Sequence, residues 1–236
     1  MALFTRASML SSGLLSSPRL LLRLLRLYVG LFAYGIAIAL ILRAGLGGSP
    51  WDVLGQGVAK TFGLSFGTAT IAISVAVLVL WIPLRQRPGW GTVSNAALIG
   101  VFADLGLAWV PPASSVPVWA PVAQAAFLTA GLVLLAFASV LYIGAGLGPG
   151  ARDGLMTGLV ARTGWPVWAV RSAIEVSVTV AGWLLGGTLG VGTAIFAFTI
   201  GPLIQLALRL LRAELEPRAS RHPAGSEREV SAGAAR

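Results

Sequence analysis

The sequence predicts an all-α membrane protein: six transmembrane helices in two inverted three-helix repeats, each with a short helix that does not span the bilayer. Three observations lead to this fold. The 236 residues are 56% hydrophobic and 11% charged, whereas soluble domains carry about 25% charged residues. Long apolar segments recur along the chain. A Gly-Leu-Gly motif occurs twice, 101 positions apart.

The net charge of +9 comes mostly from arginines that flank the apolar segments. Many of them precede the first segment or follow the last, where the positive-inside rule places them. We therefore expect the basic character to reflect topology, with both termini in the cytoplasm, and we expect no nucleic-acid partner.

The residue types that most metal and nucleophile sites require are scarce. The chain has no cysteine, and its one histidine, His222, lies in a polar tail. No metal-ligand cluster, phosphate loop or catalytic pair is recognisable. We therefore expect no metal, no cofactor, no catalytic residue and no enzymatic activity.

The apolar segments divide the chain into two halves. The expected spans cover residues 27–42, 65–84, 92–110, 122–143, 165–185 and 193–211. The expected units are a cytoplasmic lead-in at 1–26, repeats at 27–110 and 122–212, an external loop at 111–121 and a disordered, basic cytoplasmic tail at 213–236. Most tryptophans fall near span ends, so we expect them to form an interfacial belt.

In each half, a glycine-rich break in the chain separates the first span from a short helix, and the two breaks match. Residues 45–54 and 146–155 both read Gly-Leu-Gly, four variable residues, Asp, one residue and Leu. The glycines that mark these breaks are Gly45, Gly47, Gly146 and Gly148. After the first break, Ser49 suits the N-cap of a helix, Pro50 its first position and Asp52 its third.

The helices that follow the breaks are short. Residues 49–62 give about 20 Å of helix, against about 30 Å for the hydrocarbon core. Residues 150–163 form the second, with Gly63 and Gly164 as the expected C-terminal stops. Glycines at 150, 154 and 158 predict that another backbone lies against the second helix.

The similarity of the halves extends well beyond the motif. With an offset of 101, 22 of the 64 positions from 44 to 107 match their counterparts, which identifies a repeat. An odd number of spans per half reverses the second half relative to the first. Inverted repeats with interrupted helices are typical of secondary transporters, where the breaks meet near the midplane.

Three segments together resemble the YczE/YyaS/YitT family of bacterial integral membrane proteins: residues 45–54, 81–89 and 148–155. The resemblance covers residues 24–212. It implies a multi-pass protein of the bacterial cytoplasmic (inner) membrane, and it specifies no molecular activity.

Ionisable residues inside spans are costly and are by default functional candidates. Glu175 lies well inside the fifth span, one turn after Arg171. The two residues form either a structural ion pair or part of a proton- or substrate-linked site. Asp104 lies inside the third span, and its counterpart is Gln205. Asp104 serves either a solute pathway or an interhelical contact, including one with Arg171.

Asp52 and Asp153 recur at the same position of the two short helices. Capping is the ordinary role of an acid at the third helical position. The functional alternative is that two half-helix N-termini point at one site. Helix N-termini favour anions, but these carboxylates cancel that preference unless Arg152 restores it.

These features favour a small secondary transporter or exporter of an unknown small solute. The alternative is a non-transporting scaffold or regulator of another membrane system, and a third possibility is the substrate-binding membrane subunit of a larger importer. The expected partners are the lipid bilayer and the solute, with a homo-oligomer or a membrane partner protein left open.

Overall fold

The computed structural model describes residues 18–115 and 117–215, and these residues are mainly helical. The helices are α2 (Pro18–Ala44), α3 (Pro50–Phe62), α4 (Phe66–Trp81), α5 (Trp90–Trp109), α6 (Ala120–Gly144), α7 (Ala151–Thr163), α8 (Val167–Leu184) and α9 (Val191–Leu215), with 3-10 turns at Ala113–Ser115 and Pro117–Trp119. Residues 1–17 of the expected lead-in and 216–236 of the expected tail lie outside the described residues.

Five of the described helices, α2, α5, α6, α8 and α9, are long and apolar enough to cross a membrane. The other expected span, 65–84, corresponds to α4, which has only 16 residues. At about 1.5 Å per residue α4 is shorter than the hydrocarbon core. It is bent by 111° from α3, and the two together pass as one broken span or a re-entrant loop, which brings the number to at most six.

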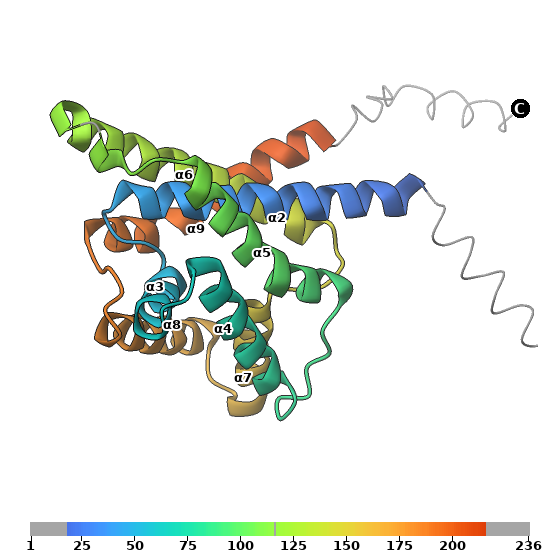
Figure 1. Ribbon diagram of the computed structural model, residues 1–236. Coiled ribbons are helices and arrows are strands. Elements are labelled where there is room, and N and C mark those ends of the chain that lie inside the picture. Colours follow the sequence, from blue (N-terminus) through green and yellow to red (C-terminus); the bar gives the residue numbers. More distant parts are fainter. Residues whose placement is uncertain (1–17, 116, 216–236) are drawn as a thin grey trace, which may run out of the picture.

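Helices α2 and α6 form the centre of the fold and run antiparallel. Gly30 of α2 faces Tyr142, near the end of α6, while Ala37, further along α2, faces Gly131, nearer the start of α6. Figure 1 shows α2, α6 and α9 as a layer of long helices, with α3, α4, α7 and α8 grouped on one side of it. The largest apolar core cluster draws many of its residues from α2 and α6.

Small residues allow α5 to approach α2 closely. A Cβ added to Gly35 of α2 would clash with Phe102 of α5. A Cβ added to Gly106 of α5 would clash with Ala39 of α2. The guanidinium of Arg43, at the end of α2, donates to the Leu107 carbonyl of α5. Close backbone approach at small residues is a common device of membrane helices.

The first short helix has the predicted cap. The Asp52 amide donates to Ser49 Oγ (3.2 Å), and Asp52 Oδ2 accepts from the Ser49 amide (3.0 Å), which completes a capping box. The helix ends at Gly63, whose φ of 65° lies in the left-handed region. Gly164 ends α7 in the same way with φ of 70°, so both predicted stops are confirmed.

The prediction that a backbone lies against the glycines of α7 is wrong. The indole of Trp81 occupies the space beside Gly154, and its Nε1 donates to the Ala151 carbonyl (3.0 Å). Trp81 is only 2% exposed, so it also does not belong to the expected interfacial belt. A buried indole needs both an apolar pocket and a hydrogen-bond acceptor, and α7 supplies both.

Asp104 joins α5 to the start of α4. Its Oδ1 accepts from the Gly67 amide (2.7 Å), and its Oδ2 accepts from Ser65 Oγ (2.5 Å). The closeness of Gly67 to the Gly100 carbonyl makes this crossing tight. Among the described residues, Asp104 therefore makes the interhelical contacts that were expected as the alternative to a solute pathway. Arg171 is not among its partners in that part of the chain.

Replacing Asp104 by alanine is expected to lower the free energy of unfolding in detergent by about 2–3 kcal/mol, because two hydrogen bonds to a charged acceptor are lost. The matched control is Gln205→Ala, at the counterpart position, where the side chain is exposed. Thermal unfolding of the purified variants measures both. Equal midpoints for the two variants would contradict the structural role of Asp104.

Candidate functional site

The two breaks are built on glycines in the left-handed region. The φ angles are 70° at Gly45, 101° at Gly47, 63° at Gly146 and 133° at Gly148. A side chain at these angles is strained, which explains the repeated Gly-Leu-Gly. The breaks therefore require glycine for backbone geometry.

Each break is held by the opposite half of the chain. The Gly192 amide donates to the Leu46 carbonyl (2.7 Å), and the Gly91 amide donates to the Leu147 carbonyl (2.8 Å). These two bonds are counterparts, since Gly91 and Gly192, like Leu46 and Leu147, are 101 positions apart. The N-termini of α5 and α9 thereby fix the starts of α7 and α3.

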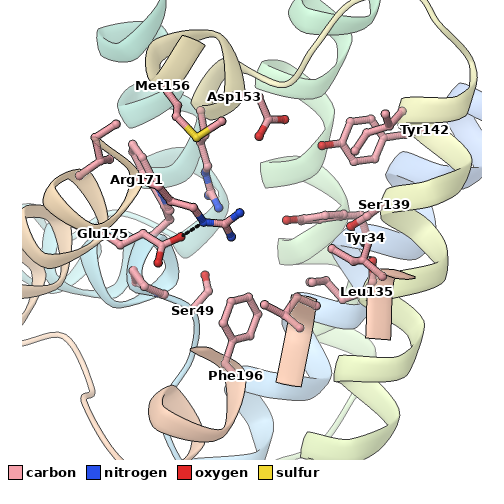
Figure 2. Close-up of a pocket in the computed structure, with 17 residues that line it drawn as sticks. Tyr34, Ser49, Leu135, Ser139, Tyr142, Asp153, Met156, Arg171, Glu175 and Phe196 are labelled. Carbon is pink, nitrogen blue, oxygen red and sulfur yellow. Dashed lines mark hydrogen bonds and ion pairs between the residues drawn. The ribbon is translucent and has the colours of Figure 1, made fainter. Parts of the chain in front are cut away.

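A cavity of about 300 Å³ lies beside the N-termini of α3 and α7. Its walls come from α2, α3, α6, α7, α8 and α9, so both halves contribute. The polar residues of the lining are Tyr34, Ser49, Ser139, Tyr142, Arg152, Asp153, Arg171 and Glu175. Figure 2 shows most of them around the central space.

Arg152 is a charged residue of this lining that makes no direct polar contact with the rest of the described chain. Its guanidinium carbon lies 4.9 Å from the centre of the Trp51 ring. Among the described residues, no carboxylate lies within 4.0 Å of its nitrogens and none of its N–H groups makes a hydrogen bond. Stacking on an aromatic face orients a guanidinium and leaves its planar donors free. Arg152 is therefore available to an acceptor in the cavity.

Arg171 and Glu175 form the ion pair that their spacing predicts. Arg171 Nε lies 3.0 Å from Glu175 Oε1, and the side chains are 59% and 35% exposed. Both line the cavity, and Figure 2 shows their pair on the wall opposite Tyr34. The pair therefore neutralises itself while remaining accessible from the cavity.

Two tyrosines face this wall from α2 and α6. The rings of Tyr34 and Tyr142 pack edge to face with centroids 5.8 Å apart. Neither hydroxyl makes a hydrogen bond within the described residues, and Figure 2 shows both pointing across the cavity toward Arg171 and Asp153. The Tyr142 hydroxyl lies 3.3 Å from the position that a Cβ on Gly150 would take. A cavity solute meets two free hydroxyls here.

The six side chains singled out from the sequence are thus only partly brought together. Arg152, Asp153, Arg171 and Glu175 line the one cavity. Asp52 does not line it: it is 1% exposed and caps α3 through Ser49, which does line it. Asp104 lies at the crossing of α4 and α5.

The cavity residues that the sequence interpretation missed are mainly aromatic. Trp51, one of the tryptophans near span ends that were expected in an interfacial belt, lies under Arg152 and lines the cavity. Tyr34 and Tyr142 carried a usable signal, since a phenol inside an apolar segment needs a polar neighbour. Nothing local indicated that these residues meet, because they come from α2, α3 and α6.

The arrangement suits binding of a small molecule through several polar contacts. No three His, Cys, Asp or Glu side chains gather as metal ligands in the part of the chain that is described. The cavity instead offers guanidinium and phenol donors, and carboxylate acceptors, around an apolar floor that includes Phe196. Small-molecule sites commonly have this composition.

Comparison with known proteins gives consistent results. The model of a family of unknown function (DUF6198) matches residues 21–209. The chain is 37% identical to an uncharacterized protein of Haemophilus influenzae, over 75% of this chain and 79% of that one. It is 34% identical to the uncharacterized membrane protein YczE of Bacillus subtilis, over 75% and 80% of the two chains.

A second Bacillus subtilis protein, YyaS, is 23% identical over 78% of this chain and 90% of its own length. No solved structure matches the chain. The resemblance stated from the three sequence segments is confirmed. With the membrane relative and the apolar helices together, the molecule is a multi-pass helical membrane protein.

Proposed function

Since the chain belongs to the YczE/YyaS family of membrane proteins and matches the family of unknown function DUF6198, we propose that it is a small secondary transporter or exporter. In this proposal it lies in the bacterial cytoplasmic membrane with both termini in the cytoplasm. Its two halves are inverted repeats, and it has no catalytic role.

Three observations support the inverted repeats. The short helices α3 and α7 begin 101 positions apart, at Pro50 and Ala151. The equivalent helices α2 and α6 run antiparallel, as a two-fold axis perpendicular to them requires, and inverted repeats have such an axis in the membrane plane. The bonds from Gly91 and Gly192 to the opposite breaks are counterparts of each other. Secondary transporters commonly place a solute site between such repeats.

The observation that carries the transport proposal is the polar cavity with Arg152 unpaired on its wall. An ionisable side chain within a membrane bundle is costly, so it usually faces a partner or a pathway. Structural contacts account for Asp104 and for one carboxylate oxygen of Asp52. The other oxygen of Asp52, Oδ1, is buried without a hydrogen-bond partner among the described residues. Arg152 makes no hydrogen bond or ion pair within the described residues, although its charge interacts with those of Asp52 and Asp153, and a solute acceptor would supply a direct contact.

The charges of the cavity favour a zwitterion as the solute. Two guanidinium groups, Arg152 and Arg171, and two carboxylates, Asp153 and Glu175, line it. The lining is therefore close to neutral, and a solute with a net charge would enter uncompensated. A carboxylate on the solute fits the free guanidinium of Arg152, and an ammonium group fits Asp153. A volume of about 300 Å³ lies at the small end of ligand sites.

The test uses purified protein and proteoliposomes. The common amino acids serve as zwitterionic probes, with propionate and propylamine as single-charge probes of similar size. We expect at least one zwitterion to raise the thermal midpoint in detergent and to enter proteoliposomes. If no probe enters, and the protein purifies with a partner in fixed stoichiometry, the scaffold function replaces transport.

The variant Glu175→Gln is expected to lower the initial rate of solute entry at least about tenfold, because it leaves the charge of Arg171 without its partner. Its thermal midpoint should change little, since an exposed i,i+4 pair contributes only about 0.3–0.5 kcal/mol. Thr179→Ala, one turn further along α8, is the control. Unchanged entry in Glu175→Gln would remove this pair from the pathway.

A further inference from the structure

The two halves differ in how their last two helices pack. In the first half, Gly67 of α4 and Gly100 of α5 meet backbone to backbone. Their counterparts 101 positions later are Trp168 and Gly201. Trp168 is 72% exposed, and no described atom lies within 4 Å of the position of a Cβ on Gly201. Thus α4 closes on α5, whereas α8 stays apart from α9.

The cavities show the same difference. The polar cavity of about 300 Å³ lies on the side of α8 and α9, and a cavity of only about 70 Å³ lies on the side of α4 and α5. Residues of the two linings are counterparts in the repeat: Arg171 and Thr70, Glu175 and Ser74, Phe196 and Asn95. The small cavity is therefore the first-half equivalent of the large one.

The two cavities also have a wall in common. Tyr34, Tyr142, Arg152 and Asp153 line both of them. These four side chains carry the free phenols, the unpaired guanidinium and a carboxylate described above. A solute bound to these four side chains would be reachable from either cavity while keeping the same contacts.

A hydrogen bond made by Thr92 in the first half has no equivalent in the described part of the second half. Thr92 Oγ1 donates to the Pro149 carbonyl (2.7 Å). The counterpart donor is Thr193 and the counterpart acceptor is the Gly48 carbonyl. Thr193 Oγ1 is buried and has no hydrogen-bond partner among the described residues. A buried hydroxyl without a partner is destabilising, and buried polar groups are rarely left so.

We propose that the small cavity is the second entrance to the same solute site, and that the two halves exchange conformations during transport. This proposal rests on the proposed transport function. In the exchanged state α8 closes on α9 and Thr193 donates to Gly48, while α4 separates from α5 and the small cavity enlarges. Because the repeats are inverted, the exchange moves the opening to the other membrane face.

Gly201 has a specific role in this exchange. It lies inside a helix long and apolar enough to span a membrane, where glycine is less favourable than alanine, and in the described structure nothing lies within 4 Å of the position of its Cβ. Closure of α8 brings Trp168 toward this space, although less closely than Gly67 lies to Gly100, because a Cβ on Gly67 would clash with the Gly100 carbonyl oxygen. Packing of the Trp81 indole on Gly154 is an example of the same contact elsewhere in the chain.

Gly201→Leu fills that space and should leave the described state intact. We expect a normal thermal midpoint and at least about tenfold slower solute entry, because the closed second half is no longer accessible. Gly144→Leu is the matched control, since Gly144 also has no described atom within 4 Å of its Cβ position. Normal entry in Gly201→Leu would overturn the exchange.

Disulfide trapping reports the exchanged state directly, because the chain has no native cysteine. Pro166 and Gln205 are counterparts of Ser65 and Asp104, whose side-chain oxygens lie 2.5 Å apart. The double variant Pro166→Cys, Gln205→Cys should form a disulfide within one chain and stop solute entry until it is reduced. The pair Ser177→Cys, Gln205→Cys is the control, because Ser177 lines a different cavity on α8.

Two threonine variants in this double-cysteine background should shift the trapping rate in opposite directions. Thr193→Val removes a bond made only in the exchanged state and should slow trapping about fivefold, the effect of one hydrogen bond. Thr92→Val removes a bond of the described state and should speed trapping by a similar factor. Equal rates in the two variants would contradict the assigned role of Thr193.

The results of these experiments distinguish a failure of the conformational exchange from a failure of the transport function on which it rests. Absence of entry for every probe removes the transport function, whatever the trapping shows. Solute entry without intrachain trapping of residues 166 and 205 overturns the exchange alone. A disulfide between two chains also overturns it, because α8 and α9 would then face a second copy.

Discussion

Replacing Arg152 by glutamine is expected to weaken binding of the transported solute about 100-fold, because the loss of a hydrogen-bonded ion pair costs up to about 3 kcal/mol. Arg152 makes no other polar contact within the described residues. Its stacking on Trp51 contributes only about 0.5–1 kcal/mol to folding, so the variant should remain folded. Solute-dependent shifts of the thermal midpoint measure the affinity.

Two further variants test the chemistry of this contact. Arg152→Lys retains the charge but loses the planar donor fork, so an intermediate affinity is expected. Arg162→Gln is the control, because Arg162 is at the far end of α7 and donates to the Pro83 carbonyl (2.8 Å). Equal affinities in Arg152→Gln and Arg162→Gln would show that Arg152 does not contact the solute.

Trp81→Ala is expected to lower the free energy of unfolding by about 3–5 kcal/mol, as large-to-small changes of buried aromatic residues do. Trp81 is 2% exposed, fills the space beside Gly154 and donates to Ala151. Because this indole connects α4 to α7, its loss removes both packing and a hydrogen bond. Thermal or denaturant-induced unfolding in detergent measures the change.

The control for this variant is Trp119→Ala, since Trp119 is 63% exposed. A change at such a position usually alters stability by less than about 0.5 kcal/mol. Gly154→Leu tests the same contact from the other side and should be as destabilising as Trp81→Ala. A small effect in both Trp81→Ala and Gly154→Leu would contradict the packing described between α4 and α7.

The features that the sequence predicted correctly depend on neighbouring residues. The cap formed by Ser49 and Asp52 and the stops at Gly63 and Gly164 follow from the preferences of single positions. The break glycines follow from a repeated pattern whose backbone angles exclude side chains. The ion pair of Arg171 and Glu175 follows from helical spacing.

The features that the sequence did not predict depend on which elements meet in space. Trp81 looked like an interfacial residue because it ends an apolar segment, and only the position of α7 shows that it is buried. Arg152 and Trp51 are at counterpart positions of different halves, so their stacking is invisible to any local pattern. The contrast between α4 with α5 and α8 with α9 is likewise a property of packing, since the repeat alone predicts two equal halves.

The reciprocal bonds that hold the breaks have a consequence for biogenesis. The second break uses the Gly91 amide, which is already synthesised when Leu147 leaves the ribosome, but the first uses the Gly192 amide. Leu46 therefore waits for the synthesis of 146 further residues before its carbonyl is satisfied. Contacts so distant in sequence form late. The first short helix thus gains this contact only after most of the described chain has been synthesised.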